Sequence, residues 1–228
     1  MDDFYINGRG ASEFSARLLA SWSVTGAELS RVLIRGAAGS TLVSPAPRLG
    51  TKTIRLPVDI FGKEPEEAEL HRSMLAAALN QGTVDLWMPD GFVYRCVLTQ
   101  VGDKTELDAW GCRVHTEFTL VGFQCRPLVR VTPSENRLYA YGTWPGMDCR
   151  LTVTVGAEAA QYKMAGVTWS NVKAGDVLVL DGLEKRILKN GFSAALDCDA
   201  ADWPRLDPGE NRLTCPDQLT VEYYPTYQ

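Results

Sequence analysis

This sequence is poor in the residues that most catalytic sites require. Its 228 residues include two histidines, His71 and His115, and neither belongs to a known catalytic motif. Ser/His/Asp and Cys/His catalysis both need a histidine as the base. The patterns G-x-S-x-G, H-E-x-x-H and G-x-x-x-x-G-K-[ST] are also absent. We therefore expect no catalytic, cofactor-binding or metal-binding residues, and predict that the protein is not an enzyme.

The six cysteines include no C-x-x-C pair, which argues against a zinc site or a thioredoxin-like redox pair. Most of them lie in or beside strand-like runs, where a reduced cysteine acts as a small hydrophobic residue. We expect reduced core cysteines, made in a cytosol. The four in strand-like runs are Cys96, Cys112, Cys149 and Cys215, and the other two are Cys125 and Cys198.

Long apolar runs and an excess of positive charge are missing too. No stretch approaches 18 apolar residues, so we expect no membrane insertion. The first ten residues have neither a basic nor an apolar region, so we expect no signal peptide. A formal net charge of −5 argues against electrostatic binding of nucleic acid, although DNA could still slide past such a surface.

Two short patterns suggest ligand sites, but each has a simpler interpretation. Gly8-Arg9-Gly10 lacks the third glycine of a dinucleotide loop and reads as a turn between strands. Five carboxylates in the stretch DCDAADWPRLDPGE could bind calcium, but the EF-hand spacing is absent. A solvated acidic loop closed by the Pro208-Gly209 turn is the favoured interpretation. The carboxylates are Asp197, Asp199, Asp202, Asp207 and Glu210.

The clearest helix signal runs from Glu64 to Gln81. Pro65 stands at its start, where a missing N–H costs nothing, and glutamates crowd the first turn, where the helix dipole favours them. Gly82 follows as a stop signal. Two apolar rows predict one broad buried stripe. The rows are Leu70, Met74 and Ala78, and beside them Leu75 and Leu79.

Strand patterns flank this helix. Residues Ile54–Ile60 alternate, with Pro57 suggesting an edge or a bulge. The runs Val84–Met88 and Phe92–Val101 form a predicted hairpin around Pro89-Asp90-Gly91, and Cys112 begins a long alternating strand. Shorter strands are predicted at Phe4–Ile6, within Phe14–Thr25 and at Arg31–Arg35. Gly36–Gly50 reads as a mobile loop or arm.

From Arg126 the pattern changes, because Pro127 and Thr132-Pro133 resemble a linker and no helix signal follows. Short strands at about 8–12-residue spacing with turn signals predict a β-sandwich or jelly roll. We predict a mainly β protein with one α-helix. An N-terminal domain, 1–132, packs a sheet on helix 64–81, and a C-terminal sandwich spans 133–228. The sandwich strands are predicted at 149–155, 161–164, 177–180, 184–189, 211–214 and 218–224.

The second half is also rich in aromatic residues, which fill cores and interfaces or form sugar-binding platforms. Core or interface is the favoured interpretation. A carbohydrate-binding module remains the alternative. The residues are Tyr139, Tyr141, Trp144, Tyr162, Trp169, Trp203, Tyr223, Tyr224 and Tyr227.

The C-terminus carries the most specific pattern. Residues 203–211 (WPRLDPGEN), followed by 219–227 (LTVEYYPTY), resemble the ending of phage distal tail proteins. Residues 4–8 (FYING) resemble the opening of that family. The order of strand, helix, hairpin and long strand resembles its first domain, and 142–145 (GTWP) and 177–181 (VLVLD) resemble parts of its second.

The resemblance implies a structural protein of a virion tail tip or baseplate. Its first domain would be a split-barrel-like sheet that closes a homohexameric ring around a DNA channel, and its second a galectin-like sandwich. The implied partners are further copies of the chain, the tail tube protein, the tail-associated hub or lysin protein, and receptor-binding proteins. No sequence-specific nucleic-acid contact is implied. The alternative function is a monomeric carbohydrate-binding β-sandwich module.

Overall fold

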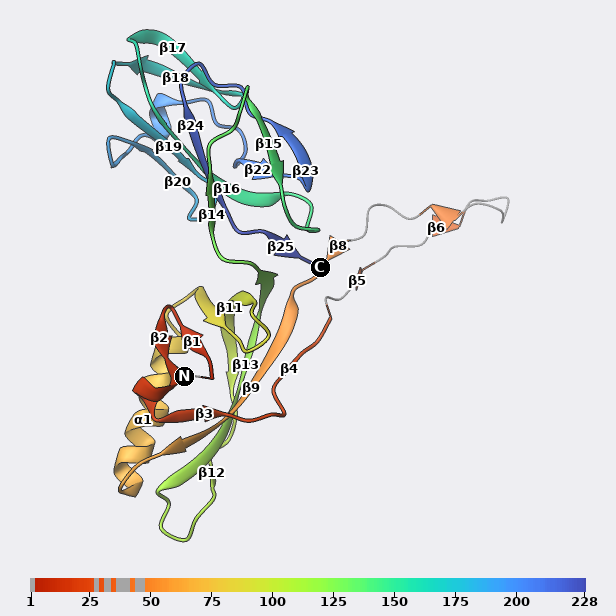
Figure 1. The fold of residues 1–228 in the computed structure, drawn as a ribbon, viewed down its shortest axis with the longest axis vertical. Coiled ribbons are helices and arrows are strands. Elements are labelled where there is room, and N and C mark those ends of the chain that lie inside the picture. The colour runs from red at the N-terminus through yellow and green to blue at the C-terminus, as the bar shows by residue number, and fades with distance from the viewer. Residues whose placement is uncertain (1–2, 27–28, 31–33, 36–41, 44–47) are drawn as a thin grey trace. The chain divides into compact units, whose positions relative to one another are not determined.

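The computed structural model describes residues 3–26, 29–30, 34–35, 42–43 and 48–228, and it is mainly β, as predicted (Figure 1). The chain divides into two compact units, unit 1 from Met1 to Cys125 and unit 2 from Arg126 to Tyr227. Each unit has its own hydrophobic core. The division falls before the predicted boundary at 132/133, because β14 (Val129–Val131) pairs with a strand of unit 2. The segment that resembled a linker is therefore partly a strand.

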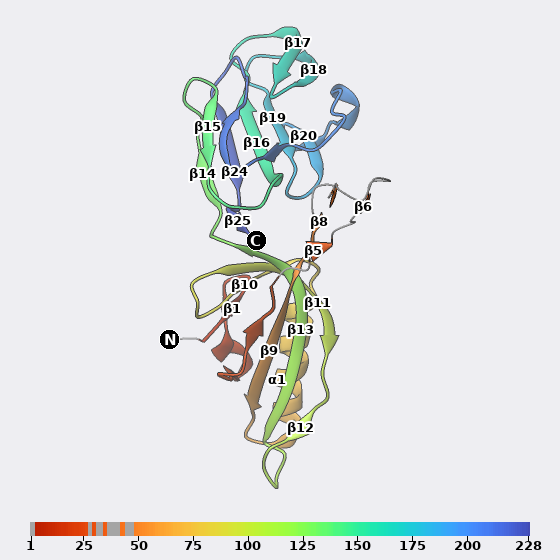
Figure 2. The ribbon, with the colours of Figure 1, turned by 90° about the vertical axis from the view of Figure 1, so that its right-hand side faces the viewer.

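Unit 1 is a twisted antiparallel sheet with one helix against it (Figures 1 and 2). Its strand order is β2-β1-β10-β11-β13-β9-β3, with β12 added to β13 and β4 added to β9. Ten consecutive residue pairs join β13 to β9. The bounds are β1 Tyr5–Ile6, β2 Arg9–Gly10, the 3₁₀-helix η1 Ala11–Phe14, β3 Ala16–Leu18, β4 Ser23–Val24, β9 Lys52–Phe61, β10 Val84–Trp87, β11 Val93–Val101, β12 Thr105–Glu106 and β13 Arg113–Cys125.

Helix α1 spans Pro65–Leu79 and packs against β9, β11 and β13. Pro65 is its first residue, as predicted, and the helix ends at Leu79 with Asn80 as its C-cap, two residues before the predicted end at Gln81. The predicted buried stripe was partly wrong. Leu75, Ala78 and Leu79 are buried together with Ala68, whereas Leu70 is 57% exposed and Met74 is 38% exposed. The buried face of α1 is therefore narrower than its apolar pattern indicated.

Pro57 lies inside β9 rather than at a sheet edge. It pairs with Glu117 of β13 on one side, and its carbonyl oxygen accepts the Leu19 N–H at 3.0 Å on the other. The N–H and C=O of one strand residue point to the same side of the strand. The missing N–H of Pro57 therefore faces the gap between the end of β3 and the start of β4. The proline therefore removes no ladder bond to β13.

A second antiparallel ladder extends from β4 and β9. Leu29–Ser30 (β5) pairs with Arg48–Leu49 (β8). This pairing has the same register as that of Ser23 with Arg55, so it continues the ladder between β4 and β9. Ile34–Arg35 (β6) pairs with Leu42–Val43 (β7) after a slip of one residue. The predicted arm at Gly36–Gly50 thus contains strand residues, while residues 36–41 and 44–47 lie outside the described part. Of the predicted strand Arg31–Arg35, residues 31–33 also lie outside it.

Unit 2 contains one larger sheet and two small ones, all contributing to one core. The larger sheet has the order β14-β24-β16-β19-β20-β21, with β22 on β16; β15 pairs with β23, and β17 pairs with β18. All six predicted strands exist, with shifted ends. The bounds are β15 Arg137–Ala140, β16 Met147–Thr154, β17 Ala159–Met164, β18 Val167–Val172, β19 Val177–Asp181, β20 Arg186–Lys189, β21 Phe192–Ser193, the 3₁₀-helix η2 Ala195–Asp197, β22 Arg205–Leu206, β23 Gly209–Arg212, β24 Leu219–Tyr223 and β25 Thr226–Tyr227.

Candidate interaction surfaces

The two histidines occupy separate structural positions in unit 1. His71 lies on α1 with its Nδ1 2.7 Å from the carbonyl oxygen of Phe61. His115 lies on β13, opposite Asp59 of β9, and its Nδ1 is 3.2 Å from a carboxylate oxygen of that residue. Arg113 donates to the other oxygen of Asp59 at 2.5 Å. Asp59 is thus engaged by two neighbours on the sheet and is 3% exposed.

The acidic stretch of unit 2 consists of turn-forming carboxylates with separate partners. Asp199 accepts the Thr168 N–H at 2.5 Å, and this backbone hydrogen bond lowers the pKa of Asp199. Asp207 accepts the Gly146 N–H at 2.9 Å, and Glu210 pairs with Arg137. Within the described residues, no group of three or more His, Cys, Asp or Glu side chains is placed to hold a metal ion.

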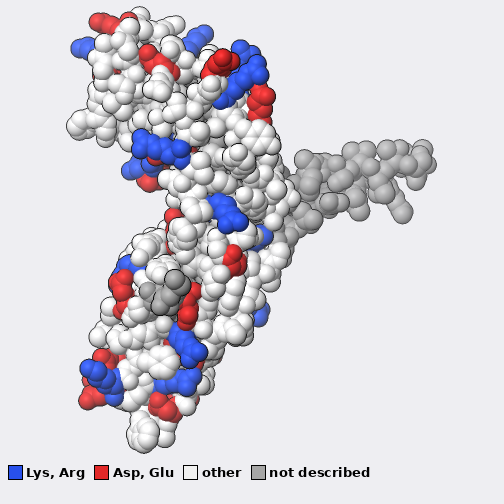
Figure 3. All heavy atoms as spheres, viewed as in Figure 1, with Lys and Arg blue, Asp and Glu red and all other residues white. Residues whose placement is uncertain are grey.

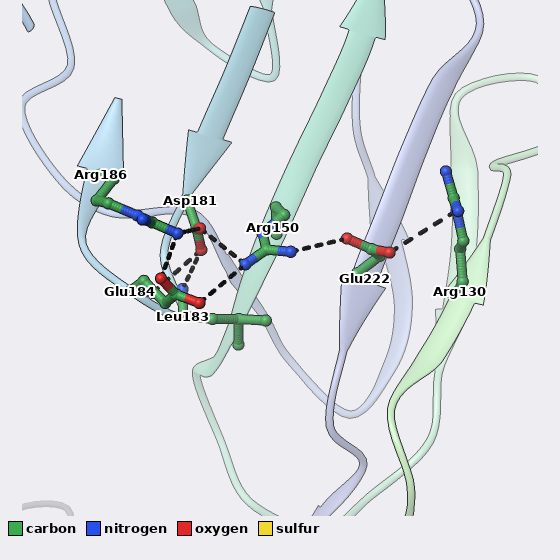
Figure 4. A network of polar contacts seen from close by, with 7 residues as sticks. All are labelled: Arg130, Arg150, Asp181, Leu183, Glu184, Arg186 and Glu222. Carbon is green, nitrogen blue, oxygen red and sulfur yellow. Dashed lines mark hydrogen bonds and ion pairs between the residues drawn. The ribbon is translucent and has the colours of Figure 1, made fainter. Parts of the chain in front are cut away.

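A row of alternating charges crosses the larger sheet of unit 2 (Figure 4). Arg130 of β14 stands opposite Glu222 of β24, which stands opposite Arg150 of β16. Arg150 in turn stands opposite Asp181 of β19, which stands opposite Arg186 of β20. Five neighbouring strands therefore contribute one charge each, with alternating sign. We call these five residues the charge row.

Arg150 is the centre of the charge row. Its guanidinium lies 2.9 Å from Asp181, 3.4 Å from Glu222 and 3.4 Å from Glu184. Desolvation opposes its charge, but the hydrogen bond and the charge of Asp181 outweigh this, so the pKa of Arg150 is raised. Asp181 is 1% exposed and also accepts the N–H groups of Leu183 and Glu184.

The charge row favours the observed register of the sheet. A slip by one residue would place each charge on the opposite face, into the apolar core. Direct cross-strand pairs of opposite charge are favourable, whereas like charges in the same positions are not. Sequence reasoning missed this row, because the five residues are far apart in the chain and become neighbours only through the strand order.

Unit 1 exposes apolar surface beside a strand that is paired on one side. β10 pairs with β11 as far as Cys96, so among the described strands Val97–Val101 pairs with β13 alone. Val97 is 41% exposed and Val101 is 42% exposed. A groove of about 330 Å³ runs between this end of β11 and α1. Its lining is Ala76, Ala77, Asn80, Leu98, Thr99, Gln100 and Val101.

Two further sites present exposed aromatic rings. In unit 1, Trp110 is 79% exposed in the loop before β13. Asp108 accepts the N–H groups of Trp110 and Cys112, so the loop backbone is held in place. In unit 2, Tyr139 and Tyr141 are each 63% exposed, and their ring centroids lie 5.4 Å apart in an edge-to-face arrangement. Tyrosine and tryptophan are enriched where proteins bind one another.

Lysine, arginine, aspartate and glutamate side chains are mixed on the face drawn in Figure 3, as on an ordinary protein surface. A surface of this kind has no strongly basic area of the sort that grips nucleic-acid phosphates. None of the helices in the described ranges has both the length and the apolar character needed to cross a membrane.

Comparison with known proteins agrees with the family resemblance. Residues 141–227 match the family of the siphovirus-type tail component, C-terminal domain. The Dit protein (gp 19.1) of phage SPP1, described as a hub adsorption apparatus component of phages infecting Gram-positive bacteria, superposes with a TM-score of 0.65. The match covers 99% of each chain at 13% identity. At this identity the likeness shows a shared fold.

The phage p2 baseplate contains chains of the same fold. In its activated conformation with Sr, a chain matches with a TM-score of 0.63 at 8% identity. The corresponding structure with Ca matches with a TM-score of 0.61, also at 8% identity. Each match covers 94% of this chain and 92% of the other. No curated protein sequence matches this chain. The family match and the full-length fold match confirm the resemblance to phage distal tail proteins.

Proposed function

We propose that this chain is a structural distal tail protein of a phage or phage-like tail particle and not an enzyme. The observation that carries the proposal is the fold match over 99% of both chains to the Dit protein of SPP1. The match of residues 141–227 to a tail component family supports it independently. In this proposal unit 1 closes a homohexameric ring, and unit 2 is the galectin-like sandwich.

The open end of β11 and the groove beside α1 are our candidates for the contact between copies. A ring of identical subunits needs a heterologous interface that closes after a fixed rotation. A strand that pairs on one side offers backbone groups to a neighbouring chain. The exposed Val97, Val101, Leu70 and Met74 would supply apolar area to the same contact.

The ring would join the tail tube protein to the tail-associated hub or lysin protein, with receptor-binding proteins as further partners. Trp110 is a candidate anchor for one of these neighbours, because large exposed aromatic residues often dominate binding energy. DNA would pass through the ring without sequence-specific contacts, helped by a net charge of −5 on each subunit. The protein would be assembled in the bacterial cytoplasm and reside in the virion tail tip.

The solution mass of the purified chain tests the ring. A monomer has a mass of 25.1 kDa, and a hexamer would have a mass on the order of 150 kDa. We expect light scattering to give the larger mass at high protein concentration. A monomer at every concentration, alone and after mixing with a tail tube preparation, would contradict the ring and favour the alternative of a monomeric carbohydrate-binding module.

The arm supplies a second test. The described pairs β5–β8 and β6–β7 extend the β4–β9 ladder beyond the sheet, and a neighbouring copy could contact such an arm. Deletion of residues 37–49 should therefore weaken the ring. Far-UV circular dichroism and the melting temperature of unit 1 serve as the folding control, and an unchanged ring in a folded deletion variant would exclude the arm from the contact.

A further inference from the structure

Two turns of this chain share one dipeptide and one backbone conformation. Asn7-Gly8 joins β1 to β2, and Asn190-Gly191 joins β20 to β21. The φ angles are 50° and 83° in the first turn and 53° and 82° in the second. Positive φ at both central residues is typical of the type I′ turn, which favours Asn-Gly. No other asparagine of the sequence precedes a glycine, so the two turns form a matched pair within one molecule.

Each asparagine binds a neighbouring strand through the same two hydrogen bonds. The Asn7 N–H donates to the carbonyl oxygen of Asp85 at 3.0 Å, and Asn7 Oδ1 accepts the Asp85 N–H at 2.9 Å. The Asn190 N–H donates to the carbonyl oxygen of Val177 at 2.8 Å, and Asn190 Oδ1 accepts the Val177 N–H, also at 2.8 Å. Both asparagines are exposed. The two turns are therefore alike in their backbone contacts and in their access to solvent.

The two side-chain amides differ at the nitrogen atom. Asn190 Nδ2 donates to Asp176 Oδ1 at 2.9 Å, whereas no residue in the described part of the chain accepts a hydrogen bond from Asn7 Nδ2. Asp176 is 9% exposed and is itself held by the Lys173 N–H at 2.8 Å and by Lys189 at 3.5 Å. The hydrogen bonds from Lys173 and Asn190 lower the pKa of Asp176, so this acceptor is charged at neutral pH. The Asn190 amide is thus fixed at both of its polar atoms, and the Asn7 amide at one.

We propose that Asn7 is a site of spontaneous deamidation and that Asn190 is protected from this reaction. After the Gly8 N–H loses its proton to base in the solvent, its nitrogen forms a bond to Cγ of Asn7. The Cγ–Nδ2 bond breaks, and the nitrogen takes up a proton from water and leaves as ammonia, which produces a cyclic succinimide. Water then opens the ring at one of its two carbonyl carbons and gives aspartate or isoaspartate. Gly8 has no Cβ to obstruct the approach, and none of the described residues accepts its N–H.

The additional hydrogen bond at Asn190 hinders this reaction, because the side chain must leave its partners before Cγ can approach the glycine nitrogen. Asn7 loses one side-chain hydrogen bond in this movement, and Asn190 loses two, one of them to a carboxylate. Hydrogen bonds to charged groups are roughly twice as strong as those between neutral groups. Isoaspartate adds a methylene group to the main chain, so it would displace the bonds between residue 7 and Asp85. In a tail particle, which makes no new protein, altered copies would accumulate with age, but the reaction itself does not depend on the proposed function.

Peptide mapping of the full chain by mass spectrometry tests this inference. The folded protein is incubated at pH 8, and deamidation at each Asn-Gly is followed over time beside the same chain unfolded in urea. In urea both sites should react at similar rates, because each is then an unstructured Asn-Gly. In the folded protein Asn7 should react faster than Asn190 by about tenfold or more, which is the ratio that one additional hydrogen bond to a charged group supplies.

Two variants separate the amide hydrogen bond from the rest of the turn. Asp176→Ala removes the acceptor of Asn190 Nδ2 and should raise deamidation at Asn190 to about the rate at Asn7. Lys189→Met removes the cation beside Asp176 but keeps that acceptor, so Asn190 should stay protected. Circular dichroism checks the folding of both variants, and the wild-type ratio decides the question if Asp176→Ala does not fold. The inference is overturned by equal rates at the two sites of the folded wild-type protein, by an unreacted Asn7 when the urea sample has reacted fully, or by protection of Asn190 that persists in a folded Asp176→Ala variant.

Discussion

Replacing Arg150 by methionine should destabilise unit 2 strongly. The side chain keeps its approximate length but loses its charge, which leaves Asp181 at 1% exposure without its partner at 2.9 Å. Removal of one member of a buried ion pair typically costs about 3–5 kcal/mol. Arg186 remains 3.7 Å from Asp181, and two turn N–H groups still donate to it. We therefore expect the lower end of that range, a loss of about 3 kcal/mol.

Chemical denaturation of the full chain, followed by tryptophan fluorescence, measures this loss. Arg137→Met is the matched control, because Arg137 pairs with Glu210 at a similar distance, 3.0 Å, but both side chains are more than 60% exposed. Its cost should be about 0.5 kcal/mol or less. Asp181→Asn combined with Arg150→Met should restore part of the loss, with a coupling of about 1 kcal/mol or more. Equal effects of the two arginine variants, or strict additivity of the two charge-row variants, would refute the argument.

Two further predictions concern buried positions. At pH 8 a thiol reagent should modify the partly exposed Cys112 and Cys198 of the native protein well before the buried Cys96 and Cys149, because the reagent must reach the sulfur atom. Burial raises the pKa of Cys96 and Cys149 to about 12 and desolvation also raises that of Cys112, so the difference in exposure sets the order, and rapid modification of all six would contradict this. Gly122→Ala should lower the free energy of unfolding by about 1–3 kcal/mol, because the added Cβ would lie 2.2 Å from the Arg95 carbonyl oxygen. Gly26→Ala is the control, because its Cβ would meet no atom within 4 Å. Melting temperatures compare the two variants, and an equally small effect of both would contradict the predicted clash.

Local signals predicted the regular elements well. The proline at the start of α1, the Pro89-Asp90-Gly91 turn and the alternation in β13 each depend on neighbouring residues, and each was confirmed. The strand predicted at Ile54–Ile60 exists as β9, but it was wrong to expect one buried face, because Pro57 and Asp59 are buried as well. In the hairpin, Asp90 accepts both the Phe92 N–H and the Tyr94 hydroxyl, as turn chemistry suggests. The strands β14, β15, β18 and β22 were missed. Three of them have only two to four residues, and the six residues of β18 do not alternate strictly between buried and exposed positions.

Features that depend on tertiary contacts could not be predicted. Leu70 and Met74 have the spacing of core residues, yet the sheet covers only the neighbouring face of α1. Pro57 suggested an edge strand, but it lies in the interior strand β9. Its missing N–H faces the gap between β3 and β4, which pair with β9 one after the other. The charge row joins residues from both ends of unit 2, Arg130 and Glu222 among them, so it has no local signature.

The pairing of β14 with β24 has a consequence for how such proteins can diversify. Val129 lies opposite Tyr223, so the first strand of unit 2 is adjacent to β24, which precedes the two-residue strand β25 near the end of the unit. A segment whose entry and exit are neighbours can be exchanged, enlarged or removed by genetic recombination with little disturbance to the remaining chain. Because each unit has its own core, the buried residues of unit 1 need not change when those of unit 2 do. A lineage could therefore vary unit 2 while it keeps the core of unit 1.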